Sequence, residues 1–248
     1  MASGILYLLP NTLGIAHPSH PLSDVIPVEV QKMTSQLSYF IVENAKTTRA
    51  YLKLVNANFP LVRPLQEIQL NELNINTKLA DLPSLLTPLL EGHDVGLISE
   101  AGVPAVADPG ANLVRIAHQN GIVVRPLVGP SSLLLSVMAS GLNGQSFAFN
   151  GYLPTDAGKR MKAIQEFEAR SRKEKQTQLF IETPYRNGAL LEALCQSCHP
   201  TTQLCIATDL TLQTEQIQTH PVSYWVAQIA KGNMPDFNKK PTVFLFLA

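Results

Sequence analysis

In the stretch Gly96-Leu-Ile-Ser-Glu-Ala-Gly-Val-Pro-Ala-Val-Ala-Asp-Pro-Gly110, an apolar strand runs directly into a loop of small residues and prolines. The glycines carry no side chain and the prolines restrict the backbone, so a ligand can approach this loop closely. Glu100 and Asp108 are its only charged residues, and it contains no phosphate-binding glycine run. The loop therefore favours a cationic or polar small ligand over a triphosphate.

A second loop with the same design follows the next apolar strand, in the stretch Val123-Val-Arg-Pro-Leu-Val-Gly-Pro-Ser-Ser132. The Gly-Pro turn ends in two hydroxyls, Ser131 and Ser132, which can cap a following helix or bind a ligand. Two such loops are expected to form two walls of one cleft.

Short apolar runs alternate along the chain with longer amphipathic segments, which is the pattern of an α/β fold. The first half predicts strands at 5–9, 39–42, 95–98 and 122–124, and helices at 110–120 and 131–140. The helix at 131–140 is apolar almost all round, so we expect it to be buried. The second half predicts strands at 147–149, 178–181, 203–207 and 242–247, and helices at 159–175 and 186–198.

The break near 126–130 indicates a hinge rather than a flexible linker. We therefore expect two α/β domains, residues 1–126 and residues 127–248, that share a rigid cleft. A chain of 248 residues with 45% hydrophobic composition is long enough for one large core or two modest ones.

Charge and composition limit the partners. The 19 basic residues balance 19 acidic residues, so no long-range field steers the chain toward nucleic acid, and any RNA site must be local. The N-terminus has no basic leader, and its apolar run is too short for a signal sequence or a membrane span, so we expect no membrane partner and a cytoplasmic location. Fingerprints of nicotinamide oxidoreductases, P-loop kinases, serine hydrolases and zinc proteases are missing.

Three cysteines argue against a disulfide framework. The stretch Cys195-Gln-Ser-Cys198-His199 matches a c-type haem attachment pattern, and together with Cys205 it has a usable zinc spacing. The simpler interpretation, half-buried cysteines at the end of a helix, is favoured, and we expect no metal.

Five motifs in order resemble the tetrapyrrole methylase superfamily, and within it the branch of ribosomal RNA small subunit methyltransferase I. They are Leu97-Ile-Ser-Glu-Ala-Gly-Val-Pro104, Asp108-Pro-Gly-Ala-Asn-Leu-Val114, Val128-Gly-Pro-Ser-Ser132, Ala139-Ser-Gly-Leu142 and Phe149-Asn-Gly-Tyr-Leu-Pro154. Outside them, Glu43-Asn44 with Thr48-Arg49 and the stretch Glu182-Thr-Pro-Tyr-Arg186 resemble further segments of that branch. The resemblance spans most of the chain.

The resemblance implies two α/β domains with S-adenosylmethionine bound in a cleft between them, and a homodimer. Loop residues able to offer backbone groups to this cofactor are Pro10, Ser99, Glu100, Ala101, Gly102, Val103, Pro104, Ser131 and Ser132. By resemblance, further contacts come from Leu153, Glu182, Thr183, Ala207, Pro241 and Thr242. The plain structural alternatives are helix capping for the two serines and strand entry for Pro241 and Thr242.

Methyl transfer to a hydroxyl needs an in-line geometry and a group that removes the proton. Glu100, Glu182 and Asp209 are the candidate bases, because carboxylates at strand ends beside a cleft can have raised pKa values. Glu43, Arg49 and Arg186 are candidate substrate-binding residues. For the two arginines, surface ion pairing is at least as good an explanation.

Departures of this sequence from the pattern of that branch leave the identity of the methyl acceptor open. Leu212 stands where the branch has a lysine, Glu100 stands where it usually has Asp, and the sequence ends at Ala248 without the extra C-terminal module expected for the RNA enzymes. The first function expected is S-adenosylmethionine-dependent methylation, with a ribose 2′-hydroxyl of ribosomal RNA as acceptor. The alternatives are methylation of a small molecule such as a tetrapyrrole, and a cofactor-binding protein without catalysis.

Overall fold

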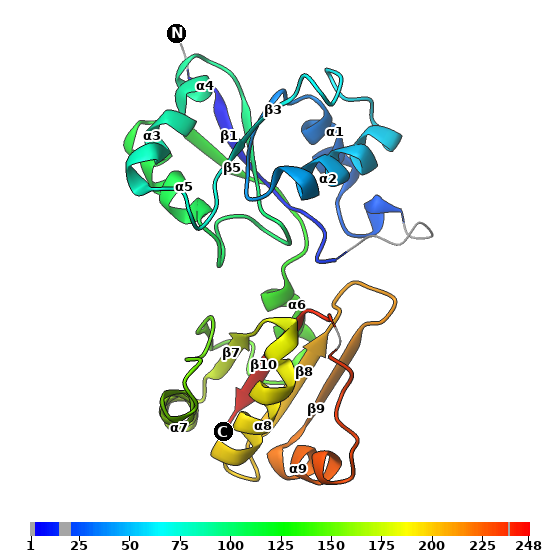
Figure 1. The fold of residues 1–248 in the computed structure, drawn as a ribbon, viewed down its shortest axis with the longest axis vertical. Helices are drawn as coiled ribbons and strands as arrows, with labels where there is room; N and C mark the ends of the chain where they lie inside the picture. Colours follow the sequence, from blue (N-terminus) through cyan, green and yellow to red (C-terminus); the bar gives the residue numbers. More distant parts are fainter. Residues whose placement is uncertain (1–2, 15–20, 238) are drawn as a thin grey trace. The chain divides into compact units, whose positions relative to one another are not determined.

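The computed structural model describes residues 3–14, 21–237 and 239–248. Its contacts divide the chain into two compact units, one up to Ser131 and one from Ser132 to Ala248 (Figure 1). Each unit has its own sheet and its own buried core. The α/β class predicted from the sequence is confirmed, and each unit is described separately below.

The first unit is built on a parallel sheet of five strands in the order β3-β2-β4-β1-β5. The strands are β1 (Ile5–Leu9), β2 (Tyr39–Val42), β3 (Gln69–Glu72), β4 (Val95–Ile98) and β5 (Val123–Pro126). The central strands β1, β2 and β4 are almost entirely buried, whereas the edge strands β3 and β5 are largely exposed. A strand needs a continuous apolar sequence only where both of its faces are covered, which explains the difference between the central strands and the edge strands.

Helices cover both faces of this sheet. One face packs against α1 (Val28–Ser35) and α2 (Ala45–Asn58) through a core that includes Phe40 and Leu52. The other face packs against α3 (Leu82–Leu85), α4 (Thr87–Leu90) and α5 (Gly110–Gln119) through a core that includes Leu97 and Leu113. Short 3-10 turns occupy Leu22–Asp24 and Leu79–Asp81. This is a doubly wound arrangement.

The second unit has a mixed sheet of five strands in the order β6-β7-β10-β8-β9. The strands are β6 (Phe147–Phe149), β7 (Thr177–Ile181), β8 (Gln203–Thr208), β9 (Gln216–Pro221) and β10 (Thr242–Leu247). Strand β6 runs parallel to β7, while β10 is antiparallel to both β7 and β8. Its central strand is therefore the last one in the sequence.

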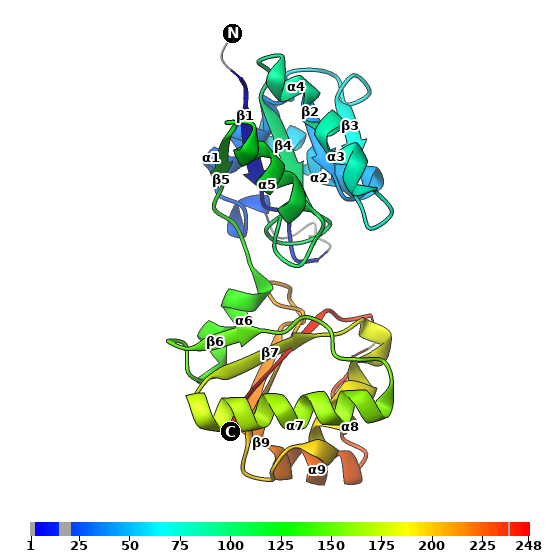
Figure 2. The ribbon, with the colours of Figure 1, turned by 90° about the vertical axis from the view of Figure 1, so that its left-hand side faces the viewer.

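Three helices cover one face of the second sheet: α7 (Ala157–Glu174), α8 (Asn187–Ser197) and α9 (Val222–Ala230), as Figure 2 shows for α7. A 3-10 turn, Pro184–Arg186, precedes α8. The remaining helix, α6 (Ser132–Ser140), contacts β8, β9 and β10, and the Thr219 hydroxyl donates to its Ser140 carbonyl at 2.7 Å. None of the described helices is both long and apolar enough to cross a membrane.

Two sequence expectations about this architecture are wrong or incomplete. Helix α6 is not buried all round, because Leu134 is 55% exposed and Met138 is 78% exposed. Its apolar composition therefore does not reflect burial within this chain. Strands β3 and β9 are absent from the predicted elements, since both are edge strands with polar sequences.

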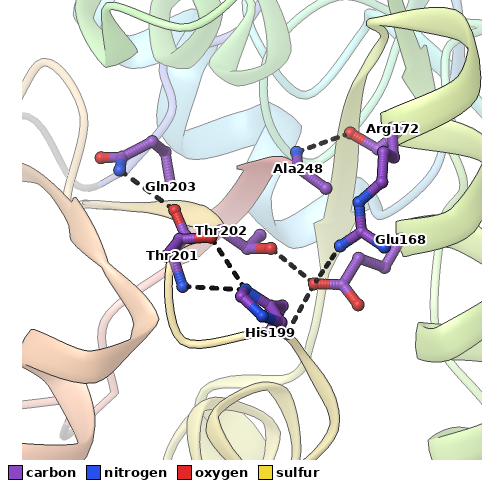
Figure 3. Close-up of polar contacts among 8 residues, drawn as sticks. Glu168, Arg172, His199, Thr201, Thr202, Gln203 and Ala248 are labelled. Atoms are coloured by element: carbon purple, nitrogen blue, oxygen red, sulfur yellow. Dashed lines mark hydrogen bonds and ion pairs between the residues drawn. The ribbon is translucent and has the colours of Figure 1, made fainter.

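A buried carboxylate in the second unit fixes the turn between α8 and β8 (Figure 3). Glu168 of α7 is 8% exposed, and its Oε1 accepts hydrogen bonds from the His199 backbone N–H and from the Thr202 hydroxyl. Arg172 lies 3.9 Å from the same oxygen but is itself mostly exposed, so it adds little. Glu168 therefore accepts from two donors of this turn, and the Thr202 side chain, which is 2% exposed, would otherwise be buried without a partner.

The cysteine stretch that matches a haem or zinc spacing spans the end of α8 and the start of this turn. Burial raises the pKa of the Cys195 thiol to about 11 and also raises the pKa of Cys198 and Cys205, so all three are held as thiols. Cys205 lies inside β8. Within the described ranges, no group of three or more His, Cys, Asp or Glu side chains is placed to hold a metal ion.

We expect Glu168→Ala to lower the free energy of unfolding by about 1–3 kcal/mol, because it leaves the Thr202 hydroxyl and the His199 N–H without an acceptor. Glu168→Gln keeps one acceptor oxygen and should cost less. Urea unfolding measures both, with Glu166→Ala on the exposed side of the same helix as the control. Equal stability of the Glu168→Ala and Glu166→Ala variants would refute the assigned role.

Candidate functional site

The loops after β1 and β4 lie side by side at the carboxyl edge of the first sheet, because these two strands are neighbours in register. The chain leaves β1 toward α1 on one face and leaves β4 toward α5 on the opposite face. Adjacent parallel strands whose connections go to opposite faces open a crevice between their loops, the usual place for a ligand in such sheets. The loop singled out from the sequence is therefore at the position where the fold favours binding.

Asn11 joins the two loops. Its side-chain Nδ2 donates to the carbonyls of Ser99 and Glu100, both at 3.0 Å, and its backbone N–H donates to the Gly102 carbonyl at 2.8 Å. Its Oδ1 accepts from the Thr12 N–H at 2.8 Å. Asn11 is only 5% exposed, so these bonds satisfy a polar side chain that burial would otherwise penalise. Asn11 is not among the residues predicted from the sequence, because its partners are far away in the chain.

Glycines let the loops after β1, β4 and β5 approach one another closely. Gly102 has φ +69°, and a Cβ there would lie 3.1 Å from the Leu13 Cδ2 and 3.5 Å from the Pro130 carbonyl oxygen. At Gly129 a Cβ would lie 2.1 Å from the Pro10 Cβ. Pro10, predicted as a cofactor contact, is thus buried against the loop that follows β5.

Asp108 shapes the second part of the β4 loop. Its carboxylate accepts from the Ala105 N–H at 2.8 and 2.9 Å and from the Gly110 N–H at 2.7 Å, where α5 begins. Ala105 and Ala107 both have positive φ, at 65° and 62°, a conformation that costs a residue with a Cβ about 1 kcal/mol or more. The Asp108 hydrogen bonds help to hold this strained loop.

A small recess at this edge is lined in part by Glu43, Ser99, Pro104 and Asp108. Glu43 Oε2 accepts the Glu100 backbone N–H at 2.9 Å, so this predicted substrate residue links the ends of β2 and β4. Burial raises the pKa of Asp108, and the nearby negative charge of Glu43 raises it further. The Glu100 carboxylate is exposed and makes no hydrogen bond to the described residues.

In the second unit, the residues predicted from the resemblance meet at one edge of the sheet. The ends of β7 and β8 lie beside the start of β10, because Ile181 and Ala207 are both paired with Val243. Glu182, Thr183, Ala207, Asp209, Pro241 and Thr242 therefore gather at this edge. The segment after β6 joins them, since the Ile181 N–H donates to the Gly151 carbonyl at 3.1 Å and the buried Leu153 follows.

Several of these side chains already have partners. Glu182, whose side chain is 3% exposed, accepts from Arg186 Nη2 at 2.7 Å and from the Thr183 N–H at 2.6 Å. The Asp209 carboxylate accepts from the Thr214 hydroxyl at 2.7 Å, in a turn where Asp209 itself has φ 52°. The ion-pair explanation considered for Arg186 is therefore the geometry observed.

The remaining predicted residues are dispersed or half exposed. Arg49 is exposed in the N-terminal part of α2. Ser131 and Ser132 lie where the first unit ends and α6 begins, and both are half-buried. Asn187 was not predicted, yet it is a fully buried side chain whose Nδ2 donates to the Lys240 carbonyl at 3.0 Å. Its Oδ1 has no hydrogen-bond partner among the described residues.

Comparison with known proteins gives a consistent result. The chain is 34% identical over 149 residues to the ribosomal RNA small subunit methyltransferase I of Vibrio cholerae, 29% over 221 residues to that of Streptococcus pyogenes, and 30% over 239 residues to that of Xylella fastidiosa. The matches cover 60%, 89% and 96% of this chain and 50%, 70% and 81% of the relatives. The matched region thus spans about half the length of the Vibrio protein. No family model matches the chain.

Solved structures show the same fold at low sequence identity. The methyltransferase CobJ superposes with a TM-score of 0.62 at 18% identity, covering 99% of this chain and 94% of that one. The cobalt precorrin-4 methyltransferase superposes with a TM-score of 0.59 at 13% identity, covering 98% and 94%. The expected tetrapyrrole methylase type of fold is confirmed.

We expect the stability of the protein to report the raised pKa of Asp108. Between about 3.9, the value in an unfolded chain, and the raised folded value, the folded protein binds more protons than the unfolded chain. Its free energy of unfolding should therefore fall as the pH rises through that window. Asp108→Asn cannot titrate, so its stability relative to the wild type should improve with pH over the same window.

Urea unfolding of both proteins at a series of pH values tests this expectation. Asp108→Asn also loses one acceptor oxygen at the Ala105 N–H, a cost that does not depend on pH. The exposed Asp81→Asn variant of the same unit serves as the control. A stability difference between wild type and Asp108→Asn that stays constant with pH would contradict the assignment.

Proposed function

Because the chain belongs to the ribosomal RNA small subunit methyltransferase I family, we propose that it transfers a methyl group from S-adenosylmethionine to a ribose 2′-hydroxyl of small-subunit ribosomal RNA. The observation that supports this most is the rigid β4 loop beside the β1 loop, at the edge of the sheet where ligands bind. The family likeness supplies the reaction, and the loop supplies a place for the cofactor. We also propose that the protein acts in the cytoplasm.

The residues present suit this cofactor. Its adenine, ribose and amino-acid ends need backbone donors and acceptors rather than cations, and the Ala101 and Val103 N–H groups make no hydrogen bond within the described part of the chain. Gly102 leaves room where a side chain would crowd Leu13 and Pro130. In the second unit, Thr183, Ala207 and Thr242 offer backbone groups at one sheet edge. We propose that these two sets, with Pro10, Ser99, Glu100, Pro104, Ser131, Ser132, Leu153, Glu182 and Pro241, hold the cofactor.

When bound, the cofactor supplies an electrophilic methyl group on a sulfonium. The chain must then orient the acceptor hydroxyl in line with that methyl and accept its proton. Of the three proposed bases, Glu182 is engaged by Arg186 and Asp209 by Thr214, whereas the Glu100 carboxylate is free within the described residues and exposed. Glu100 is therefore the best placed to take the proton.

Substrate contacts are proposed for Glu43, Arg49 and Arg186. Arg49 is exposed on α2 and can meet a phosphate, whereas Arg186 would have to share its guanidinium with Glu182. Glu43 already accepts the Glu100 N–H through one oxygen, so only its other oxygen is available. Arg49 is thus the best candidate for anion binding among the three.

Two alternatives rest on specific observations. The balanced charge and the likeness in fold to the cobalt precorrin-4 enzyme favour a small tetrapyrrole acceptor. Leu212, where the family has a lysine, favours a cofactor-binding protein without turnover. For the assembly we propose a homodimer, supported by the exposed apolar side chains of Leu134 and Met138, which a second copy could cover.

Calorimetric titration with S-adenosylmethionine tests the cofactor, and we expect micromolar affinity. Gly102→Leu should abolish detectable binding, because its side chain fills the loop. Gly121→Leu is a matched control, since Gly121 has φ +67°, a Cβ added there would meet no atom within 4 Å, and the residue precedes the start of β5. Equal affinity in the two variants would place the cofactor elsewhere.

Methyl transfer from labelled S-adenosylmethionine to small-subunit ribosomal RNA tests the reaction. We expect Glu100→Gln to lower the transfer rate by about 100-fold or more, the usual contribution of a general base. Its cofactor affinity should change little, and Glu91→Gln, exposed before the start of β4, should keep the wild-type rate. Wild-type turnover by Glu100→Gln would leave Glu182 and Asp209 as the candidate bases.

A further inference from the structure

A groove on the second unit is lined only by residues of that unit. It is bounded by β8, the edge strand β9, helix α9 and the segment that follows α9, and it encloses about 520 Å³, including space open to solvent. Its floor is formed by Ile206 and Thr208 of β8, whose neighbours across the strand pair are Gln218 and Gln216. None of the residues predicted for the cofactor or the acceptor lines it.

The polar groups of the groove are uncharged. Gln216 and Gln218 stand on the same face of β9, and neither side chain makes a hydrogen bond within the described residues. On the opposite wall, Asn233 Nδ2 donates to Gln228 Oε1 at 3.1 Å, which fixes a second pair of amides. Each amide presents a donor next to an acceptor, the pattern that matches the edge of a nucleobase.

An aromatic wall completes the groove. Tyr224 is 37% exposed, and its ring is held by stacking on His220 with 3.8 Å between the ring centroids. Trp225 packs edge to face with Tyr224, and its Nε1 donates to the Leu204 carbonyl at 3.0 Å, so its ring is fixed. A rigid, partly exposed aromatic ring beside free amides is the usual environment of an unpaired base bound by a protein.

We propose that this groove binds one unpaired nucleobase of the RNA acceptor, stacked beside Tyr224 and hydrogen-bonded by the Gln216 and Gln218 amides. The inference rests on the proposed function, because it assigns part of the recognition of the same RNA. The groove lining carries no charge, so it reads the base and not the phosphate. Among the positively charged residues, Lys231 is the one nearest in the sequence to a residue that lines the groove, two positions before Asn233.

Trp225 makes the test direct, because it is the single tryptophan of the chain and lines the groove. Single-stranded ribooctamers of A, C or U are titrated into the full chain while its tryptophan emission is followed. We expect a saturable change with the three octamers differing in affinity. Tyr224→Ala should weaken binding by about 10-fold or more, as expected for one lost base stack, while Tyr224→Phe should retain most of it.

The double variant Gln216→Ala/Gln218→Ala should reduce the differences in affinity among the three octamers. Gln119→Ala, an exposed glutamine in the first unit, is the matched control and should behave as the wild type. Thermal unfolding verifies that each variant is folded. RNA binding that is unchanged in both groove variants would overturn the inference. The sugar maltose is titrated in parallel, and a change of tryptophan emission with maltose but not with RNA would overturn it too.

Calorimetry with S-adenosylmethionine separates this inference from the proposed function. Octamer binding lost in the groove variants, with cofactor affinity unchanged, supports both. Octamer binding in the groove without any cofactor binding would support the base site and overturn the proposed methyltransferase function. Cofactor binding with no emission change from any octamer would overturn the base site alone.

Discussion

The hydrogen bonds from the Asn11 side chain to the carbonyls of Ser99 and Glu100 are the constraint on which the candidate site depends. Parallel strands are not joined by tight turns, so the loops at their carboxyl ends are held together only by contacts between the loops. Asn11 supplies these contacts from a buried position, and Gly102 and Gly129 allow the backbones to meet. A loop held this rigidly keeps its remaining N–H groups in fixed positions for a ligand.

The sequence predicted the buried strands well but missed two of the four edge strands, those with polar sequences, for a physical reason. Strands β1 and β4 are covered on both faces and must be apolar, which makes them visible as runs. Strands β3 and β9 have an open edge, so they carry polar residues and resemble loops. The prediction for helix α6 was wrong in the opposite sense, because its apolar composition suggested burial, yet Met138 is largely exposed.

The residues of the candidate site also differ in how well a local sequence pattern predicts them. The position of the β4 loop followed from local sequence, because a strand that ends in glycines and prolines needs no distant partner to be recognised. The roles of Asn11 and Glu43 depend on residues 57 to 89 positions away, which no local pattern contains. The resemblance implied roles for Glu182 and Arg186 individually, but only the structure shows that they form an ion pair, whereas the Glu100 carboxylate makes no hydrogen bond to the described residues.

The balanced charge of the chain has a consequence for RNA recognition. Phosphate neutralisation supplies most of the non-specific affinity of nucleic-acid-binding proteins, and it requires clustered cations. With 19 basic and 19 acidic residues, this chain has no net charge to provide it. For the proposed RNA acceptor, short-range contacts to bases would then add to any local cations, and stacking on an aromatic ring and bidentate amide bonds are the strongest uncharged means. In the proposed base site, Tyr224 and the amides of Gln216 and Gln218, which make no hydrogen bond to the described residues, would supply both in one groove, at an edge strand whose polar sequence has no use in the core.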